Sequence, residues 1–165
     1  MDVTIRPATP DDYEAICEVL DEVDALHREA LPHIFRKPEG PVRERADILE
    51  QVAGGINMSL FVAEASGQVV GVLQVLMCES PPERHQVPRY YASIDDLVVR
   101  KSWRRRGVGR ALMTRAEQWA RERDLEVIEL GVWEFNDDAI RFYEQLGYTT
   151  LSRMMSKPLR DPSGS

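Results

Sequence analysis

The stretch that decides the fold runs from Ser93 to Ala120 and reads SIDDLVVRKSWRRRGVGRALMTRAEQWA. It begins with an apolar, β-branched run that is typical of a strand. A basic turn with two glycines follows, and apolar residues then recur at the period of an amphipathic helix. This order of strand, glycine turn and helix predicts a βα unit whose turn lies at the amino terminus of the helix.

The turn between this strand and this helix has the properties of an anion site. A helix amino terminus presents unpaired N–H groups and a partial positive charge. Gly107 and Gly109 have no side chain, so a phosphate can come close to the backbone there. Permanent positive charge that suits phosphate oxygens comes from four neighbouring arginines: Arg104, Arg105, Arg106 and Arg110.

Three kinds of phosphate ligand are compatible with such a turn. A nucleotide P-loop requires a Gly-Lys-Ser/Thr sequence, which does not occur in this chain. A dinucleotide fingerprint requires a third glycine where Leu112 stands, and it belongs in a first βα unit rather than past mid-chain. The pyrophosphate of coenzyme A is the third option.

Two motifs resemble the GCN5-related N-acetyltransferase family. Arg104-x-x-Gly107-x-Gly109, between an apolar strand and a long helix, is similar to that family's Arg/Gln-x-x-Gly-x-Gly/Ala signature. The segment Asn136–Tyr148, NDDAIRFYEQLGY, is similar to the family's later segment with its Asn, Ala, Phe-Tyr and Leu-Gly-Phe/Tyr. The two motifs cover about residues 94–155, and the amino-terminal part matches only in its order of elements. The resemblance implies an α/β fold with a mixed, mostly antiparallel central sheet flanked by helices.

The remaining pattern fits one domain over residues 1–165, with a frayed tail at about 158–165. Expected strands cover residues 3–6, 60–65, 69–77, 90–99, 127–132 and 148–155. Expected helices cover residues 10–25, 43–52 and 107–123, and a last helix follows an Asn136 cap.

The resemblance also implies which residues bind acetyl-CoA. The Arg105–Arg110 backbone would hold the pyrophosphate, and the strand end Leu97–Val99 would pair with the pantetheine amides. Asn136 would contact the pantetheine arm, although an N-cap role explains it equally well. The implied cofactor-binding residues are Leu97, Val98, Val99, Arg104, Arg105, Arg106, Gly107, Val108, Gly109, Arg110, Asn136 and Tyr143.

The same resemblance supplies two catalytic candidates. Tyr143 would be the general acid for the leaving thiolate, although its place on an apolar helix face also fits a core aromatic. Asp96 would be the general base that takes the proton of the amine. Asp95 is its neighbour, and adjacent strand residues face opposite sides, so only one of the two should face the site unless a bulge intervenes. Glu129 and Glu134 are weaker candidates for the base.

Composition narrows the partners and the location. A formal net charge of −7 disfavours nucleic acid and anionic membranes, and it is compatible with a cationic substrate. Cys17 and Cys78 are far apart and have no nearby His pair, so we expect no metal. The chain shows no apolar run of about 18 residues and no leader pattern, so we expect a cytoplasmic protein.

The leading hypothesis is therefore an enzyme that acetylates a primary amine of a small molecule or peptide. Residues 24–45 and 79–91 would shape the acceptor pocket, and they contain no motif that identifies the acceptor. The alternative is a non-catalytic acyl-CoA-binding regulatory module, against which the presence of both Tyr143 and Asp96 argues. A homodimer fits the habit of the family, and nothing in the sequence decides it.

Overall fold

The computed structural model of the chain describes residues 2–81 and 83–160. The chain divides into two compact units, Met1–Gly131 and Val132–Ser165, and each is described by itself. In the expected tail, Pro158–Arg160 are exposed and irregular, while residues 161–165 lie outside the described part. The expectation of a single domain over residues 1–165 stays a prediction.

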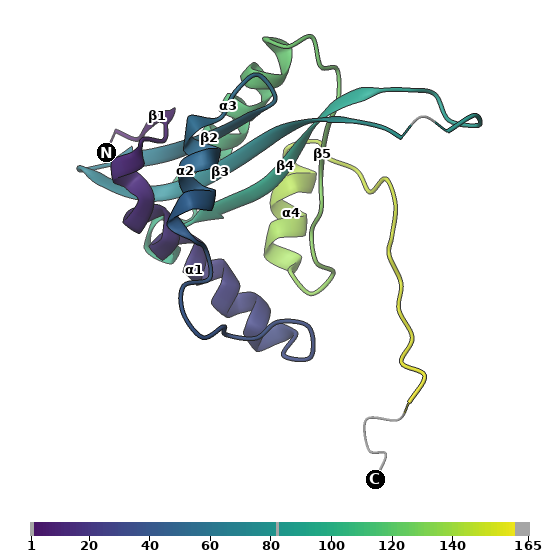
Figure 1. Cartoon of the computed structure of the whole chain (residues 1–165), viewed down its shortest axis with the longest axis horizontal. Helices are drawn as coiled ribbons and strands as arrows, with labels where there is room; N and C mark the ends of the chain where they lie inside the picture. Colours follow the sequence, from purple (N-terminus) through teal and green to yellow (C-terminus); the bar gives the residue numbers. More distant parts are fainter. Residues whose placement is uncertain (1, 82, 161–165) are drawn as a thin grey trace. The chain divides into compact units, whose positions relative to one another are not determined.

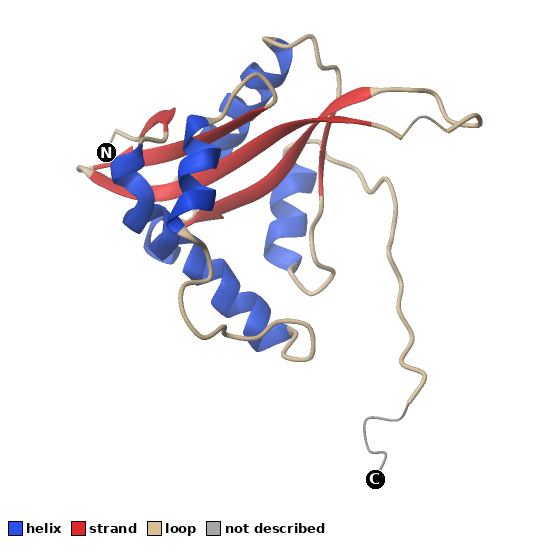
Figure 2. Ribbon diagram, in the orientation of Figure 1, coloured by secondary structure: helices blue, strands red, loops and turns tan. Residues whose placement is uncertain are grey.

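The first unit is built on a five-stranded sheet in the order β1-β2-β3-β4-β5 (Figure 2). The strands are β1 (Thr4–Pro7), β2 (Met58–Ala65), β3 (Gln68–Glu79), β4 (Tyr90–Val99) and β5 (Ile128–Leu130). Neighbours from β1 to β4 are antiparallel, and β5 is parallel to β4. The mixed, mostly antiparallel sheet expected from the sequence is confirmed.

Helices cover both faces of this sheet (Figure 1). The helical elements of this unit are the short 3-10 helices η1 (Pro10–Asp12) and η2 (Lys101–Trp103), and the helices α1 (Tyr13–Ala30), α2 (Arg45–Ala53) and α3 (Val108–Arg121). Leu60 and Val62 of β2 belong to the same buried cluster as α1 and α2 residues. Ser59, one position from Leu60, accepts a hydrogen bond of 2.8 Å from the indole of Trp119 in α3. Since successive strand residues face opposite sides, α3 covers the face opposite to α1 and α2.

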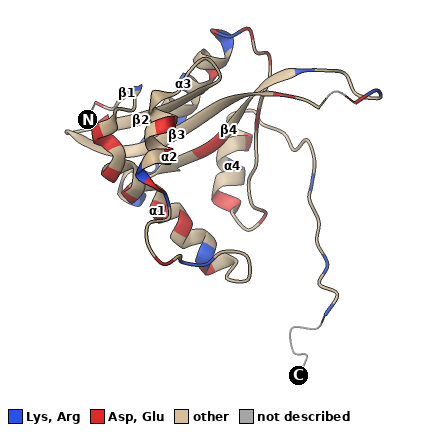
Figure 3. Cartoon of the chain, in the orientation of Figure 1, with Lys and Arg blue, Asp and Glu red and all other residues tan. Residues whose placement is uncertain are grey.

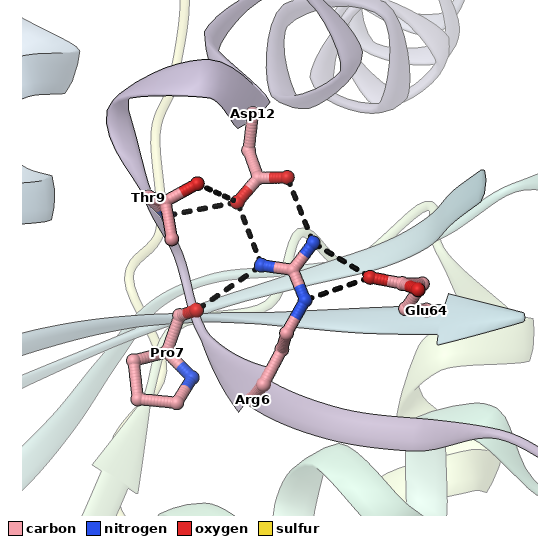
Figure 4. Close-up of polar contacts among 5 residues, drawn as sticks. All are labelled: Arg6, Pro7, Thr9, Asp12 and Glu64. Atoms are coloured by element: carbon pink, nitrogen blue, oxygen red, sulfur yellow. Dashed lines mark hydrogen bonds and ion pairs between the residues drawn. The ribbon is translucent and has the colours of Figure 1, made fainter. Parts of the chain in front are cut away.

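An ion-pair network links the edge strand β1 to η1 and β2 (Figure 4). The Arg6 guanidinium donates to both carboxylate oxygens of Asp12, at 2.8 and 2.9 Å, and to Glu64 at 2.7 Å. Asp12 also accepts hydrogen bonds from the backbone N–H and the hydroxyl of Thr9, at 2.8 and 3.0 Å. The Arg6 guanidinium, followed by the Thr9 donors, lowers the pKa of the buried Asp12 carboxyl to about 2. The network therefore joins β1, η1 and β2 most strongly while Asp12 is ionised.

The second unit contains α4 (Asp137–Gln145), which begins as the sequence predicts. The Asn136 side chain accepts a hydrogen bond of 3.1 Å from the Ala139 N–H, so Asn136 is the N-cap. Gly147 adopts the left-handed φ of +93° just beyond the helix, where a glycine avoids the steric cost of a Cβ.

The prediction of a strand at residues 148–155 is wrong. This segment is irregular, and Leu151, Met154 and Met155 are largely exposed. A strand is stable only when its N–H and C=O groups pair with a neighbouring strand, and an alternating pattern alone does not supply that neighbour. The expected strand at 127–132 and helix at 107–123 are also shorter in the structure, whereas α1 continues five residues beyond its expected end at residue 25.

Candidate active site

A β-bulge interrupts β4 at its two acidic residues. Gln74 of β3 pairs with Asp96, and the next β3 residue, Val75, pairs with Ile94. Asp95 is therefore the extra residue on β4. The bulge removes the simple alternation on which the sequence argument about Asp95 and Asp96 depended: Asp95 is exposed, while Asp96 is partly buried.

Beyond the bulge, one edge of β4 is open. The parallel pairing with β5 covers Ala92, Ser93 and Ile94. On the other side, β3 pairs with β4 up to Val99. In the part of the chain that the structure describes, no strand pairs with the β5-side edge of β4 between Asp96 and Val99. Backbone N–H and C=O groups on an unpaired edge can hydrogen-bond to an extended ligand.

The open edge leads into the basic turn. Arg105 has a φ of +61° and Gly107 a φ of +83°, so two left-handed residues reverse the chain just before α3. Gly107 is the N-cap of α3 and has no side chain with which to cap it. The first intrahelical bond that involves it runs from the Ala111 N–H to the Gly107 carbonyl, at 3.0 Å. The N–H groups of the first helical turn, from Val108 onward, are therefore available to an anion.

Four arginines lie next to these N–H groups in the chain. Arg104 donates from Nε to the Val99 carbonyl at 3.0 Å, which ties the turn to the end of β4. The Arg106 guanidinium lies 5.1 Å from the centroid of the Trp103 ring. Arg104, Arg105, Arg106 and Arg110 are all exposed. The turn thus combines backbone donors with accessible positive charge, the arrangement that an anion site requires.

Asp96 lies in an environment that favours its neutral form. Burial raises the pKa of the Asp96 carboxyl, and the nearby charges of Asp95 and Asp24 add to that effect. The Arg43 guanidinium opposes the rise. Arg43 is itself held by Asp24 of α1 in an ion pair of 2.5 Å. A carboxyl with a raised pKa beside an open strand edge is a reasonable candidate base, because its proton affinity moves towards that of the group it must deprotonate.

Asn136 and Tyr143 lie in the second unit, in and next to α4. The Tyr143 ring contacts Phe142 and Tyr148 in edge-to-face geometry, at centroid distances of 5.2 and 5.8 Å. Burial, with a smaller contribution from Tyr148, raises the pKa of Tyr143 to about 12. Tyr143 is therefore a neutral hydroxyl donor at every physiological pH.

The weaker base candidates are engaged by arginines. Glu129 of β5 forms an ion pair with Arg89. Glu134 lies 3.5 Å from Arg153. Each of these two carboxylates is thus already occupied by an arginine partner. This arrangement favours Asp96 over both of them.

The structure adds residues that the sequence argument missed. Glu18 and Glu22 of α1 contact the segment just after β4, across separations of 82 and 79 residues. Arg43 contacts α1 through Asp24. No local motif could have revealed these contacts, since each joins residues that only the tertiary fold brings together.

Two general features can be stated for the described residues. Across residues 2–81 and 83–160, no group of three or more His, Cys, Asp or Glu side chains is arranged to hold a metal ion. In the same residues, no helix has the length and apolar character needed to cross a membrane.

A mixed sheet that is covered by helices on both faces, with a glycine turn at the start of α3, is the architecture of the α/β acyltransferases. The chain matches the model of the acetyltransferase (GNAT) family over residues 20–148, and it belongs to that family. It is accordingly an acetyl-CoA-dependent N-acetyltransferase.

Two relatives that are named as N-acetyltransferases and one solved structure are similar to this chain. An uncharacterized N-acetyltransferase of Lactobacillus delbrueckii subsp. lactis is 30% identical over 142 residues, which cover 81% of this chain and 80% of that protein. The glucosamine 6-phosphate N-acetyltransferase of Trypanosoma brucei brucei is 28% identical over 83% of this chain and 90% of its own length. The crystal structure of a mutant BH1408 protein from Bacillus halodurans matches with a TM-score of 0.90 at 26% identity, over 95% of this chain and 99% of that one.

Proposed function

We propose that this enzyme acetylates a primary amine of a small molecule or peptide, with acetyl-CoA bound along β4 and at the amino terminus of α3. One observation carries the proposal: the open edge of β4 from Asp96 to Val99 leads directly into a turn with accessible N–H groups and exposed arginines. An extended pantetheine arm and a pyrophosphate need these two surfaces in this order.

The proposed cofactor contacts follow from this geometry. The N–H groups of the first α3 turn, together with Gly107 and the arginines around it, would hold the pyrophosphate. The backbone of Leu97, Val98 and Val99 would pair with the pantetheine amides. An N–H group near Val98 or Val99 would then polarise the thioester carbonyl, a contribution worth about 3–4 kcal/mol in other enzymes.

Asp96 would take the proton of the incoming amine, directly or through water. A primary ammonium has a pKa of about 10, so it must lose a proton before it can attack the thioester. The raised pKa of Asp96 brings the carboxylate closer to that value and makes it a stronger base than an exposed aspartate. This environment supports Asp96 rather than Asp95 in the role.

Tyr143 would stabilise the departing thiolate. A simple thiol has a pKa of about 8.5, against about 12 for Tyr143. Complete proton transfer from Tyr143 to sulfur is unfavourable, because the two pKa values differ by roughly 3.5 units. The role we propose is therefore a hydrogen bond from the Tyr143 hydroxyl to the sulfur, with the thiolate released as such or protonated by solvent. Asn136, already the cap of α4, would contact the pantetheine arm only through whatever hydrogen-bonding capacity the cap leaves free.

Amino sugars are the acceptors to test first. The Trypanosoma brucei brucei relative is named for glucosamine 6-phosphate, an amino sugar. The net charge of −7 also suits a cationic acceptor more than an anionic one, so free amino sugars belong in the screen beside phosphorylated ones. Since the cosubstrate is acetyl-CoA, the proposed place of action is the cytoplasm.

Titration calorimetry with CoA, ATP and NAD tests the cofactor, because these three ligands represent the three phosphate sites compatible with the turn. We expect binding of CoA and not of the other two. Thiol release from acetyl-CoA over a panel of amino sugars, polyamines and peptides then tests the chemistry. Binding of CoA without turnover of any amine would favour the regulatory-module alternative, and failure to bind CoA would refute the proposed function.

A further inference from the structure

Two glutamates of α1 contact the segment that joins β4 to the turn. Glu18 and Glu22 are one helical turn apart and therefore share a face of α1. Glu18 accepts a hydrogen bond of 2.7 Å from Arg100, and Glu22 accepts one of 2.8 Å from the backbone N–H of Lys101. Figure 3 shows the acidic residues along α1. Neither glutamate belongs to a motif of the family resemblance.

Glu22 caps η2 from another element. The η2 segment begins at Lys101, and the first N–H groups of any helical turn lack partners within it. The residue in the N-cap position is Arg100, whose side chain has no hydrogen-bond acceptor. The Glu22 carboxylate replaces the missing local cap by accepting from the Lys101 N–H.

The same Glu22 oxygen also lies near the far end of η2. It is 4.0 Å from Nη2 of Arg104, the first residue of the glycine motif. The Nε of Arg104 donates to the Val99 carbonyl, so the guanidinium is held between β4 and α1. Arg100 is anchored separately, since its N–H donates to the Val70 carbonyl at 2.9 Å. Among these two glutamates of α1, Glu22 is thus the one that contacts the segment after Arg100, at Lys101 and at Arg104.

We propose that Glu22 is a positioning residue. It holds residues 101–107, which comprise η2 and the first part of the glycine turn, in the conformation that binds acetyl-CoA. The inference rests on the proposed function, because it assumes that this turn binds the cofactor. A turn that is already ordered loses less conformational entropy when the pyrophosphate binds. The negative charge of Glu22 acts in the opposite sense, since it partly offsets the positive charge of the arginines that attract phosphate. The hydrogen-bond acceptor, rather than the charge, is what helps the cofactor to bind.

Three substitutions separate the acceptor from the charge. Glu22→Gln keeps an acceptor oxygen at the same reach and removes the charge. Glu22→Asp keeps the charge and shortens the side chain by one methylene. Glu22→Ala removes both. The matched control is Glu117→Ala, which breaks an exposed ion pair with Arg121 at the other end of α3.

Titration calorimetry of CoA binding to each full-length variant tests the proposal. We expect Glu22→Ala and Glu22→Asp to raise the Kd for CoA about tenfold, which is about 1.4 kcal/mol. Glu22→Gln should bind CoA at least as tightly as the wild type, and Glu117→Ala should match the wild type. With any acceptor found by the amine screen, Glu22→Ala should raise KM for acetyl-CoA and leave kcat within about twofold.

The outcomes are distinguishable. If wild-type protein does not bind CoA, the proposed function fails before Glu22 is tested. If the wild type binds CoA and Glu22→Ala binds it equally well, the positioning role is refuted. If Glu22→Gln is as weak as Glu22→Ala, the charge rather than the acceptor matters, and this too overturns the proposal. Should Glu22→Ala prove unfolded by its thermal transition, the comparison of Glu22→Gln with Glu22→Asp decides the question alone.

Discussion

Gly71 of β3 lies against Leu112 of α3 so closely that a Cβ on Gly71 would stand 3.0 Å from Leu112 Cδ1. The same Cβ would be 3.2 Å from the Val98 carbonyl oxygen and 3.3 Å from Val108 Cγ1. Val98 is on the strand proposed to bind pantetheine, and Val108 is the first residue of α3. Gly71 therefore sets how closely the start of α3 approaches the sheet at β3, next to Val98 of β4.

Gly71→Ala should damage both stability and cofactor binding. An added methyl in a filled core costs about 1–3 kcal/mol, because neighbouring atoms must move. The atoms that must move here belong to β4 and to the first turns of α3, so we expect weaker CoA binding as well as a lower urea midpoint. Urea denaturation and calorimetry measure the two effects. Gly131→Ala is the control, since a Cβ at Gly131 meets nothing within 4 Å and should change neither property. A Gly71→Ala protein with wild-type stability would contradict the packing described.

Asp96→Asn should stabilise the protein while it lowers activity. The pKa of Asp96 is raised on folding, so the folded state disfavours the ionised carboxylate, and this penalty is complete above the folded-state pKa. Asparagine removes the penalty, and we therefore expect a higher melting temperature at pH 7 and no gain below about pH 4, where unfolded aspartate is protonated.

If Asp96 is the base, Asp96→Asn should also reduce turnover by about 10² or more and abolish the acidic limb of the pH–rate profile. Activity of the wild type should be lost as the pH falls through the raised pKa of Asp96. Asp95→Asn changes the adjacent, exposed bulge residue and is the matched control for both readouts. Unchanged turnover in Asp96→Asn would assign the base elsewhere.

Tyr143→Phe should keep the fold and lower turnover by about 10² or more, because only the hydroxyl is lost. Since the pKa of Tyr143 is about 12, its ionisation should not limit activity between pH 6 and about pH 10. Steady-state thiol release over that range measures both expectations. Tyr148→Phe removes the hydroxyl of the neighbouring ring and serves as the control. Full activity in Tyr143→Phe would remove the residue from the mechanism.

Asp12→Asn should destabilise the protein by about 2 kcal/mol at pH 7. The folded-state pKa of Asp12 is lowered to about 2 from an ordinary value of 3.8, so its contribution is present above about pH 4 and is lost as the pH falls through about 2. Urea denaturation of both proteins at pH 7, 4 and 2.5 should show the difference shrinking over that range. A difference that stays constant with pH would show that the Arg6–Asp12 pair is not its source.

Local sequence was sufficient wherever a short segment carries its own physical signal. The glycine motif predicts the turn and the start of α3, and Asn136 predicts the cap of α4; both are confirmed. The strand 90–99 was also predicted to the residue, because its apolar run lies between Pro88 and the basic turn. The sequence alone, through two motifs, was also enough to indicate the family.

The tertiary structure decided what depends on partners distant in sequence. It rejected the strand at 148–155, because strand formation requires a hydrogen-bonded neighbour that a local pattern does not supply. It placed a bulge at Asp95 because β3 and β4 differ by one residue across that point, which a single strand's sequence cannot show. It also brought Glu22 to Lys101 across 79 residues. The sequence by itself determined the turn and indicated the family, while the environment of Asp96 and the support of the turn came only from the folded chain.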